Sequence, residues 1–254
     1  MFMNTTLLRP SSLVLALLLG ATVASAKVTE KFAQTYPLDA NGSIHLENVN
    51  GSVEVIAWDK NEVSLEAEKS ARDQDGLSRM HLRIDSTNRR LTVKTELEKK
   101  WRFWDNMNAQ VHYKLMVPAG VTVDKIDVVN SGITVTGVKG PVNLEAVNGG
   151  IEADGLSTDG RFRTVNGSIR VGYATLPASG SVSLKTVNGT CTLTLPKDAA
   201  FDLDSDTVNG RISCDFPITL QNSGKRELRG PVNGGGTRIS LESVNGNLTV
   251  AGAK

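Results

Sequence analysis

The sequence predicts an all-β protein: a β-solenoid, in which short strands joined by Val-Asn-Gly turns stack on one another, preceded by a β-hairpin region. The octapeptide Thr-Val-Asn-Gly-Thr-Cys-Thr-Leu at residues 186–193 recurs with small changes from Asn48, Thr164 and Ser243. The third and fifth residues after the turn asparagine are usually apolar, which is the period of a strand with one buried face. Only 5% of the residues are aromatic, while Gly, Val, Thr and Asn are abundant, as in β structure with many turns.

Residues 1–26 have the features of a signal peptide. Arg9 supplies a basic start, residues 13–19 are apolar, and Ala-Ser-Ala at 24–26 is a cleavage site that leaves Lys27 as the mature start. The apolar run is shorter than the about 20 residues that span a bilayer, and no Cys follows it for lipid attachment. We therefore expect a protein exported to the periplasm, the cell surface or the medium, with no transmembrane segment in the mature chain.

The charge balance argues against nucleic acid and anionic membranes as partners. Removing the signal peptide takes away one of 28 basic residues and leaves 27 basic against 27 acidic residues. A neutral surface of mixed sign does not attract polyanions. The remaining chain is long enough for one elongated domain or two subdomains.

Residues 27–120 are predicted to form an N-terminal β region in which the repeat begins and is then interrupted. Residues 27–40 are expected to be a lead-in, and two copies of the turn follow at Asn41 and Asn50. The later segments are a strand, turn and strand over 56–67, a polar loop over 70–78, a hairpin over 80–95 and a strand over 111–117 that ends at Pro-Ala-Gly.

Residues 121–254 are predicted to be the solenoid proper. Its turn asparagines follow at intervals of 18, 18, 22, 21, 24 and 12, and they are Asn130, Asn148, Asn166, Asn188, Asn209, Asn233 and Asn245. A second turn lies midway in several units, at 139–141, 158–160 and 178–180. Each coil is thus expected to hold two strands and two turns and to stack in parallel on the next. Strands about 4.8 Å apart would bring the asparagines into a side-chain amide ladder.

Two other all-β architectures are compatible with parts of the pattern. Asn-Gly is also the strongest hairpin signal, so an antiparallel meander or sandwich competes with the solenoid. A fixed turn phase near twenty residues favours the solenoid. A membrane β-barrel would need aromatic girdles, and this chain is poor in aromatic residues.

Side chains alternate between the core and the solvent along a strand, so the position of a residue after its turn asparagine (its parity) predicts where its side chain points. Cys191 and Cys214 stand three and five residues after their turn asparagines, so we expect two buried free thiols. With their coils stacked as direct neighbours, the two would be diagonal partners about 7–8 Å apart, at or beyond the limit for a disulfide. His45, His81 and His112 have the opposite parity and are expected to face solvent, with no nucleophile or metal-ligand spacing.

Two further clusters each have a functional and a structural interpretation. Asp202, Asp204 and Asp206 share one face of a strand, which suits calcium but equally suits a solvated outer face, and we favour the outer face. Residues 99–107 gather Trp101, Trp104, lysines and an arginine. This segment is interpreted either as a cap over an open end of the core or as an interaction surface, and we favour the cap.

The repeat resembles a known family. The segment Asn-Val-Asn-Gly-Ser-Val-Glu-Val-Ile-Ala-Trp-Asp at 48–59, the exit Val-Pro-Ala-Gly at 117–120 and the serial Val-Asn-Gly turns resemble the bacterial putative adhesin family, domain of unknown function 4097. This family is related to autotransporter adhesin heads, and the resemblance covers residues 40–250. It implies a right-handed, β-solenoid-like envelope domain without an established activity. Some members add a membrane helix or a long charged N-terminal region, and neither is expected here.

Two hypotheses for the function remain. The first is a non-catalytic, adhesin-like binding or scaffold module for an envelope protein or polysaccharide, with no catalytic, cofactor or metal residues. The second is an enzyme acting on envelope polysaccharide, which should gather carboxylates on one face of consecutive coils. The sequence has no nucleophile elbow, phosphate loop or dinucleotide fingerprint, and only the Asp202–Asp206 triplet approaches such a cluster. We favour the binding module.

Overall fold

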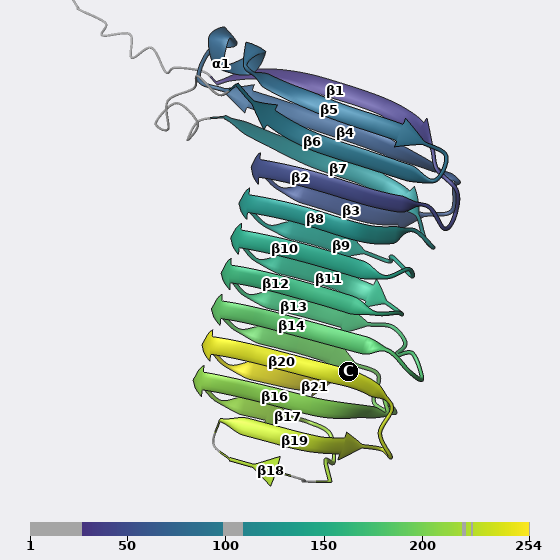
Figure 1. The fold of residues 1–254 in the computed structure, drawn as a ribbon, viewed down its shortest axis with the longest axis vertical. Helices are drawn as coiled ribbons and strands as arrows, with labels where there is room; N and C mark the ends of the chain where they lie inside the picture. Colours follow the sequence, from purple (N-terminus) through teal and green to yellow (C-terminus); the bar gives the residue numbers. More distant parts are fainter. Residues whose placement is uncertain (1–26, 99–108, 220–221, 225, 254) are drawn as a thin grey trace, which may run out of the picture.

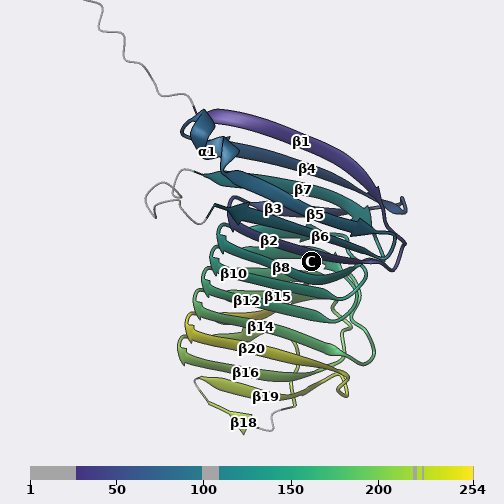
Figure 2. The same cartoon turned by 45° about the horizontal axis from the view of Figure 1, so that its top comes forward.

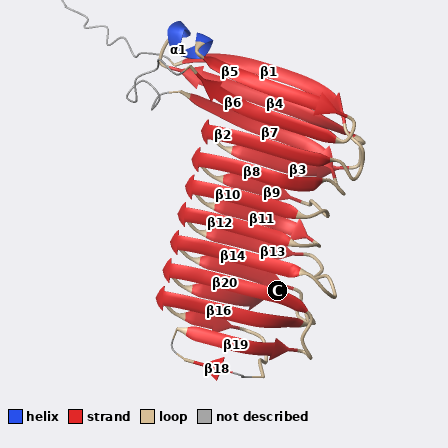
Figure 3. Ribbon diagram, in the orientation of Figure 1, coloured by secondary structure: helices blue, strands red, loops and turns tan. Residues whose placement is uncertain are grey.

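Two long sheets lie face to face along a single stack of coils (Figure 1). The structure is a computed structural model, and it describes residues 27–98, 109–219, 222–224 and 226–253. Strands dominate the described residues, and loops are confined to the two long sides of the stack (Figure 3). The predicted all-β class is confirmed.

The first sheet, called sheet A, contains ten strands among the described residues. In spatial order they are β1 (Val28–Pro37), β4 (Glu62–Ala71), β7 (Gln110–Pro118), β3 (Val53–Trp58), β9 (Ile133–Thr136), β11 (Ile151–Leu156), β13 (Ile169–Tyr173), β15 (Cys191–Leu195), β21 (Leu248–Gly252) and β17 (Ile212–Cys214).

The second sheet, called sheet B, contains eleven strands in the same part of the chain. In spatial order they are β18 (Asn222–Ser223), β19 (Glu227–Val232), β16 (Phe201–Asn209), β20 (Thr237–Asn245), β14 (Ser181–Asn188), β12 (Gly160–Asn166), β10 (Val142–Asn148), β8 (Thr122–Asn130), β2 (Ser43–Asn50), β6 (Arg90–Leu97) and β5 (Met80–Thr87).

Each coil gives one strand to each sheet, as the two-strand, two-turn interpretation predicts. In the coil of Asn148, β10 lies in sheet B and β11 in sheet A, and both pair in parallel with the next coil. The pairing is in register, with Leu144 opposite Phe162 and Asn148 opposite Asn166. The solenoid is therefore confirmed, and an antiparallel arrangement of the repeat is wrong.

Alternating side chains from both sheets fill the core. In the turn of Asn166, the third and fifth residues after the asparagine, Ile169 and Val171, are buried. On the other sheet, Phe162 and Leu184 are fully buried opposite them. Since neighbouring coils repeat this parity, one apolar core runs through the described part of the stack.

The N-terminal region differs from the prediction at two places. Residues 28–37 are no lead-in but the strand β1, which pairs antiparallel with β4 along its whole length. The expected loop at 70–78 instead contains the end of β4 and a short helix, α1 (Gln74–Ser78). Asp73 caps α1 by accepting a hydrogen bond from the Gly76 N–H, and buried Leu77 anchors the helix. The predicted hairpin is confirmed as β5 and β6.

The coil order departs from the sequence order at the C-terminal end. The strands β20 and β21 insert between the coil of β14 and β15 and the coil of β16 and β17 (Figures 1 and 2). Asn245 therefore lies between Asn188 and Asn209. Asn233 belongs to the connection between β19 and β20 and has φ of 51°, so its inclusion among the stacked turns was wrong.

Both sheets continue across residue 120, because β2 pairs in parallel with β8 and β3 with β9. The first coil of the solenoid is thus built from residues of the N-terminal region. The division of the chain at residue 120 remains a prediction.

The close stacking of the turns predicts a large effect of adding a methyl group there. A Cβ on Gly167 would overlap the carbonyl group of Gly149 in the neighbouring coil, whereas a Cβ on Gly224 would meet open space. We expect Gly167→Ala to lower the free energy of unfolding by about 1–3 kcal/mol, since the coils must move apart. Urea denaturation measures this, with Gly224→Ala as the control. Equal stability of the two variants would contradict the stacking argument.

Candidate functional site

The turn asparagines form a continuous ladder of side-chain hydrogen bonds along one side of the stack. In each bond, the Nδ2 of one asparagine donates to the Oδ1 of the asparagine in the preceding coil of the stack. The donor–acceptor distances lie between 2.8 and 3.0 Å. The ladder runs through Asn50, Asn130, Asn148, Asn166, Asn188, Asn245 and Asn209. The predicted amide ladder is confirmed.

The other polar groups of the turn also form hydrogen bonds between neighbouring coils. The Gly167 N–H donates to the Asn188 carbonyl at 3.0 Å, and the buried Thr186 hydroxyl donates to the Gly167 carbonyl at 3.0 Å. The same hydroxyl-to-carbonyl bond recurs at Thr164, Thr207 and Ser243. Thr, Asn and Gly of the motif therefore hold neighbouring coils together, and none of them is presented as a catalytic group.

The valine of the motif has a different environment. Six of the seven valines that precede the ladder asparagines are the large apolar side chains exposed among the described residues, at 36–51% of their surface. They line the outer face of sheet B beside the ladder, in the order Val129, Val147, Val165, Val187, Val244 and Val208. We call this the valine column, and its members repeat at the strand spacing of about 4.8 Å.

Sequence reasoning missed the valine column, although the signal was present. Val165 has the outward parity, since it lies next to inward Thr164 and two residues after exposed Arg163. On the solvated face of a sheet, the outward positions are usually occupied by polar residues, so an apolar residue there is unusual. The recurrence of a valine at this outward position in successive turns of the repeat is the observation that could have identified this surface.

A row of charged residues runs beside the valine column. The register aligns Glu47, Asp127 and Glu145 on three consecutive coils, an alignment that the sequence did not reveal. Lys94 binds Glu47 at 2.8 Å, and Lys125 binds both Asp127 and Glu145 at 3.0 Å.

The partners of Glu47 stabilise the charged form of its carboxyl group. Hydrogen bonds from His45 and Lys94 lower the pKa of Glu47, and hydrogen bonds to Asp127 and Glu145 raise the pKa of Lys125. A general acid needs a carboxyl group that retains its proton near neutral pH. The row therefore fits a solvated, ion-paired surface better than a catalytic site.

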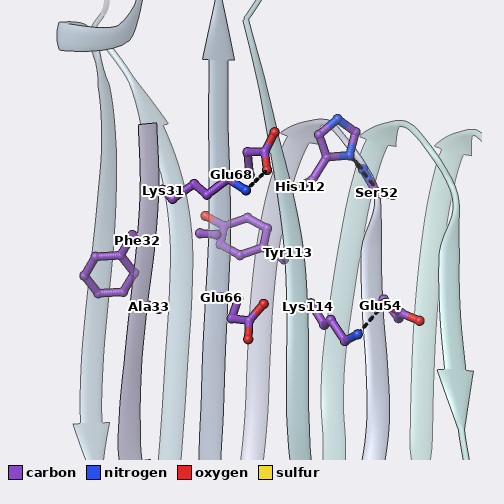
Figure 4. Close-up of a pocket in the computed structure, with 11 residues that line it drawn as sticks. Lys31, Phe32, Ala33, Ser52, Glu54, Glu66, Glu68, His112, Tyr113 and Lys114 are labelled. Carbon is purple, nitrogen blue, oxygen red and sulfur yellow. Dashed lines mark hydrogen bonds and ion pairs between the residues drawn. The ribbon is translucent and has the colours of Figure 1, made fainter. Parts of the chain in front are cut away.

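The outer face of sheet A is hollowed across β1, β4, β7 and β3 (Figure 4). Two ion pairs cross this hollow, Lys31 with Glu68 at 3.3 Å and Lys114 with Glu54 at 3.9 Å. His112 lies at its rim, where its Nδ1 is 2.9 Å from the Ser52 Oγ and accepts from the Ser52 N–H at 3.2 Å.

The Ser52–His112 contact corrects the expectation that no histidine meets a nucleophile. A histidine that acts as the general base for a serine nucleophile needs a third group that orients its imidazole ring. Among the described residues, no hydrogen bond to the Nε2 of His112 is formed, and the contact is exposed. The contact is therefore an incomplete catalytic triad. It holds β7 against the turn of Asn50.

The other histidines are placed only partly as expected. His81 is exposed and lies 3.7 Å from Glu98. His45 was expected to face solvent, but only 17% of its side chain is exposed, because it leans on Glu47 at 2.8 Å.

The aspartate triplet lies on the outer face of sheet B, as predicted. Asp204 binds Arg229 at 2.7 Å, and Asp202 accepts a hydrogen bond from the Gly236 N–H at 3.2 Å. Within the described ranges, no group of three or more His, Cys, Asp or Glu residues could hold a metal ion. The positive charge beside Asp204 is the guanidinium of Arg229.

Both cysteines are free, as predicted, but their surroundings differ from the prediction. Cys191 is fully buried, and burial raises its pKa to about 12. Cys214 is half-buried instead of buried. The two are not diagonal neighbours, because β21 lies between them, with Leu248 opposite Cys191 and Val250 opposite Cys214.

Two sequence predictions fall outside the described residues. These are the signal peptide at 1–26 and the aromatic cluster of Trp101 and Trp104 within 99–107. In the part of the chain that is described, helix α1 is too short to cross a bilayer, and no other segment forms a membrane-spanning helix.

Comparison with known proteins supports the family resemblance. Residues 127–251 match the model of the family described as Toastrack DUF4097, so the predicted resemblance is confirmed for the repeat. The fold is similar to that of a putative cell adhesion protein from Clostridium sporogenes, with 11% identity, a TM-score of 0.54 and coverage of 89% of this chain and 100% of that chain.

A putative adhesin from Bacteroides fragilis is a more distant structural match. It shares 12% identity at a TM-score of 0.41, over 88% of this chain and 97% of that chain. No curated protein matches this sequence. At such low identities, the Clostridium structure shows the fold alone.

The ladder predicts that stability depends on the position of an asparagine within it. Asn166 makes two ladder bonds, and Asn209, at the end, makes one. Because each net hydrogen bond contributes about 1 kcal/mol, Asn166→Ala should cost about twice as much stability as Asn209→Ala. Chemical denaturation of the two variants compares them directly. A larger loss at Asn209 would show that the ladder bonds do not set the difference.

The cysteines predict an ordered reaction with thiol reagents. Thiolate is the reactive form, and the raised pKa of both thiols keeps them protonated near neutral pH. We expect slow labelling of Cys214 in the folded protein and labelling of Cys191 only after unfolding. Titration in denaturant without reductant should find both thiols, and Cys214→Ala should remove the first phase. The absence of any free thiol would mean a disulfide.

Proposed function

We propose that the protein is an exported, non-catalytic envelope protein of adhesin-like type, which acts as a binding or scaffold module at the cell surface or in the periplasm. Its partner is an envelope protein or polysaccharide that lies along the stack on the outer face of sheet B. The observation that supports this best is the valine column, a straight line of exposed apolar side chains beside the amide ladder.

The column suits an extended partner. Each valine offers a small apolar contact, and the contacts repeat at a fixed spacing of about 4.8 Å along the stack. The hollow that Val187, Val244 and Val208 line on this face extends over several coils, so affinity would accumulate over several coils. Exposed apolar surface that is continuous over many residues is typical of interaction sites.

The alternative, an enzyme acting on envelope polysaccharide, has less support from the geometry. It needs two convergent carboxyl groups, one of which keeps a proton. The aligned row of Glu47, Asp127 and Glu145 is the arrangement in the described chain that comes nearest, and each of its carboxylates is paired with a lysine. The match to the Toastrack family and the name of the Clostridium structure, a cell adhesion protein, also favour the binding module.

Substitution of the valine column tests the proposal. The variant Val147→Ser/Val165→Ser/Val187→Ser removes the central apolar contacts while leaving the turns intact. We expect it to lower the amount of protein that co-sediments with isolated envelope fragments by about tenfold, which corresponds to about 1.4 kcal/mol. Thermal denaturation of each variant ensures that only folded protein is compared.

The matched control is Thr134→Ser/Thr192→Ser/Thr194→Ser on the outer face of sheet A. It also removes three outward β-branched methyl groups, so it corrects for the lower strand propensity of serine. Equal binding by the wild type and both triple variants would refute a role of the valine column. Hydrolysis of purified envelope polysaccharide by the wild type would favour the enzyme instead.

A further inference from the structure

The eight Asn-Gly pairs of this chain are chemically equivalent in sequence but not in structure. Asparagine followed by glycine is prone to deamidation, because the glycine nitrogen can reach the side-chain amide carbon without a Cβ in the way. The reaction requires that nitrogen and that amide to leave their hydrogen bonds. The fold therefore decides which pair can react.

The four Asn-Gly pairs in the interior of the ladder are restrained at every reacting atom. At Asn166, Nδ2 donates to Asn148 and Oδ1 accepts from Asn188. The nitrogen that would attack, that of Gly167, donates to the Asn188 carbonyl at 3.0 Å. The same three bonds hold Asn148–Gly149, Asn188–Gly189 and Asn245–Gly246.

The pair Asn233–Gly234 lies outside the ladder and is restrained at one atom. Both residues are exposed, in the connection between β19 and β20. The Asn233 Nδ2 donates to the Ala199 carbonyl at 2.9 Å. No hydrogen bond from the Gly234 N–H is formed to any residue that the structure describes, and the space around its Cα is open.

We infer that Asn233 is a deamidation site of the folded protein and that the amide ladder protects the four Asn-Gly pairs in its interior. The Gly234 nitrogen bonds to Cγ of Asn233 and loses its proton to solvent. The Cγ–Nδ2 bond breaks, and the Nδ2 group takes up a proton from solvent and leaves as ammonia. Water then opens the resulting succinimide ring to aspartate or isoaspartate, with no oxidant or reductant.

The product changes the contacts of this connection. A carboxylate at position 233 no longer donates to the Ala199 carbonyl and faces it with a negative charge. The Asp202 carboxylate, which accepts from the Gly236 N–H, lies close to the same loop and adds to the repulsion. Deamidation therefore weakens the attachment of the segment that leads into β20.

Peptide mapping by mass spectrometry tests the inference on the full-length protein during incubation in mildly alkaline buffer. At least two more hydrogen bonds must open at a ladder position, so we expect Asn233 to convert about tenfold faster than Asn166 or Asn188. Unfolding in urea is the control, and it should bring the rates at all eight pairs close together.

The variant Asn233→Ser supplies a second readout. Isoelectric focusing of the incubated wild type should show a growing acidic species, and the amount of this species should be lower in the variant. Conversion of Asn166 or Asn188 as fast as Asn233 in the folded protein would overturn the inference. An acidic species of unchanged amount in Asn233→Ser would also overturn it.

Discussion

The structure depends on the contact between backbone turns that lie one strand spacing apart. At this spacing, the turn of one coil rests directly on the carbonyl groups of the next, and a side chain at the Gly167 position has no room. The Asn166 amide, the Gly167 N–H and the Thr186 hydroxyl then satisfy the polar groups at the contact. Because the turn fixes where the sheet B strand of each coil ends and where the sheet A strand begins, it also fixes the parity of both strands. The core and both outer faces follow from this contact.

A fold of this kind distributes chemistry along a line. Equivalent positions of successive coils form columns, so valines, asparagines and charges each recur at the strand spacing. The carboxylates of Glu47, Asp127 and Glu145 consequently lie side by side with lysines and do not converge around one substrate atom. Such a surface is suited to an extended partner that forms many weak contacts along the stack. The Ser52–His112 pair shows the same limit, since no third strand of the described residues supplies an orienting group.

Much of the fold could be predicted from strand parity and turn phase. The buried positions of Ile169 and Val171, the ladder at Asn166 and the free thiol of Cys191 all follow from counting residues after a turn. The order of the last coils could not be predicted in this way. The turns at Asn188, Asn209 and Asn245 carry the same groups, so any of them can stack on any other. Long-range pairings such as β1 with β4, and the exposure of the valine column, likewise depend on which strands become neighbours.

The insertion of β20 and β21 has a consequence for how the chain folds as it leaves the ribosome. The strand β16 is synthesised before β20, yet in the finished stack β20 occupies the edge of β14. Since N-terminal segments tend to fold first, β16 meets that edge while its final neighbour does not yet exist. The coil of β16 and β17 must therefore remain undocked or be displaced when residues 237–252 arrive. Completion of the stack becomes a late, non-local step, and a chain cut before β20 cannot place the coil of β16 and β17 against its final neighbour.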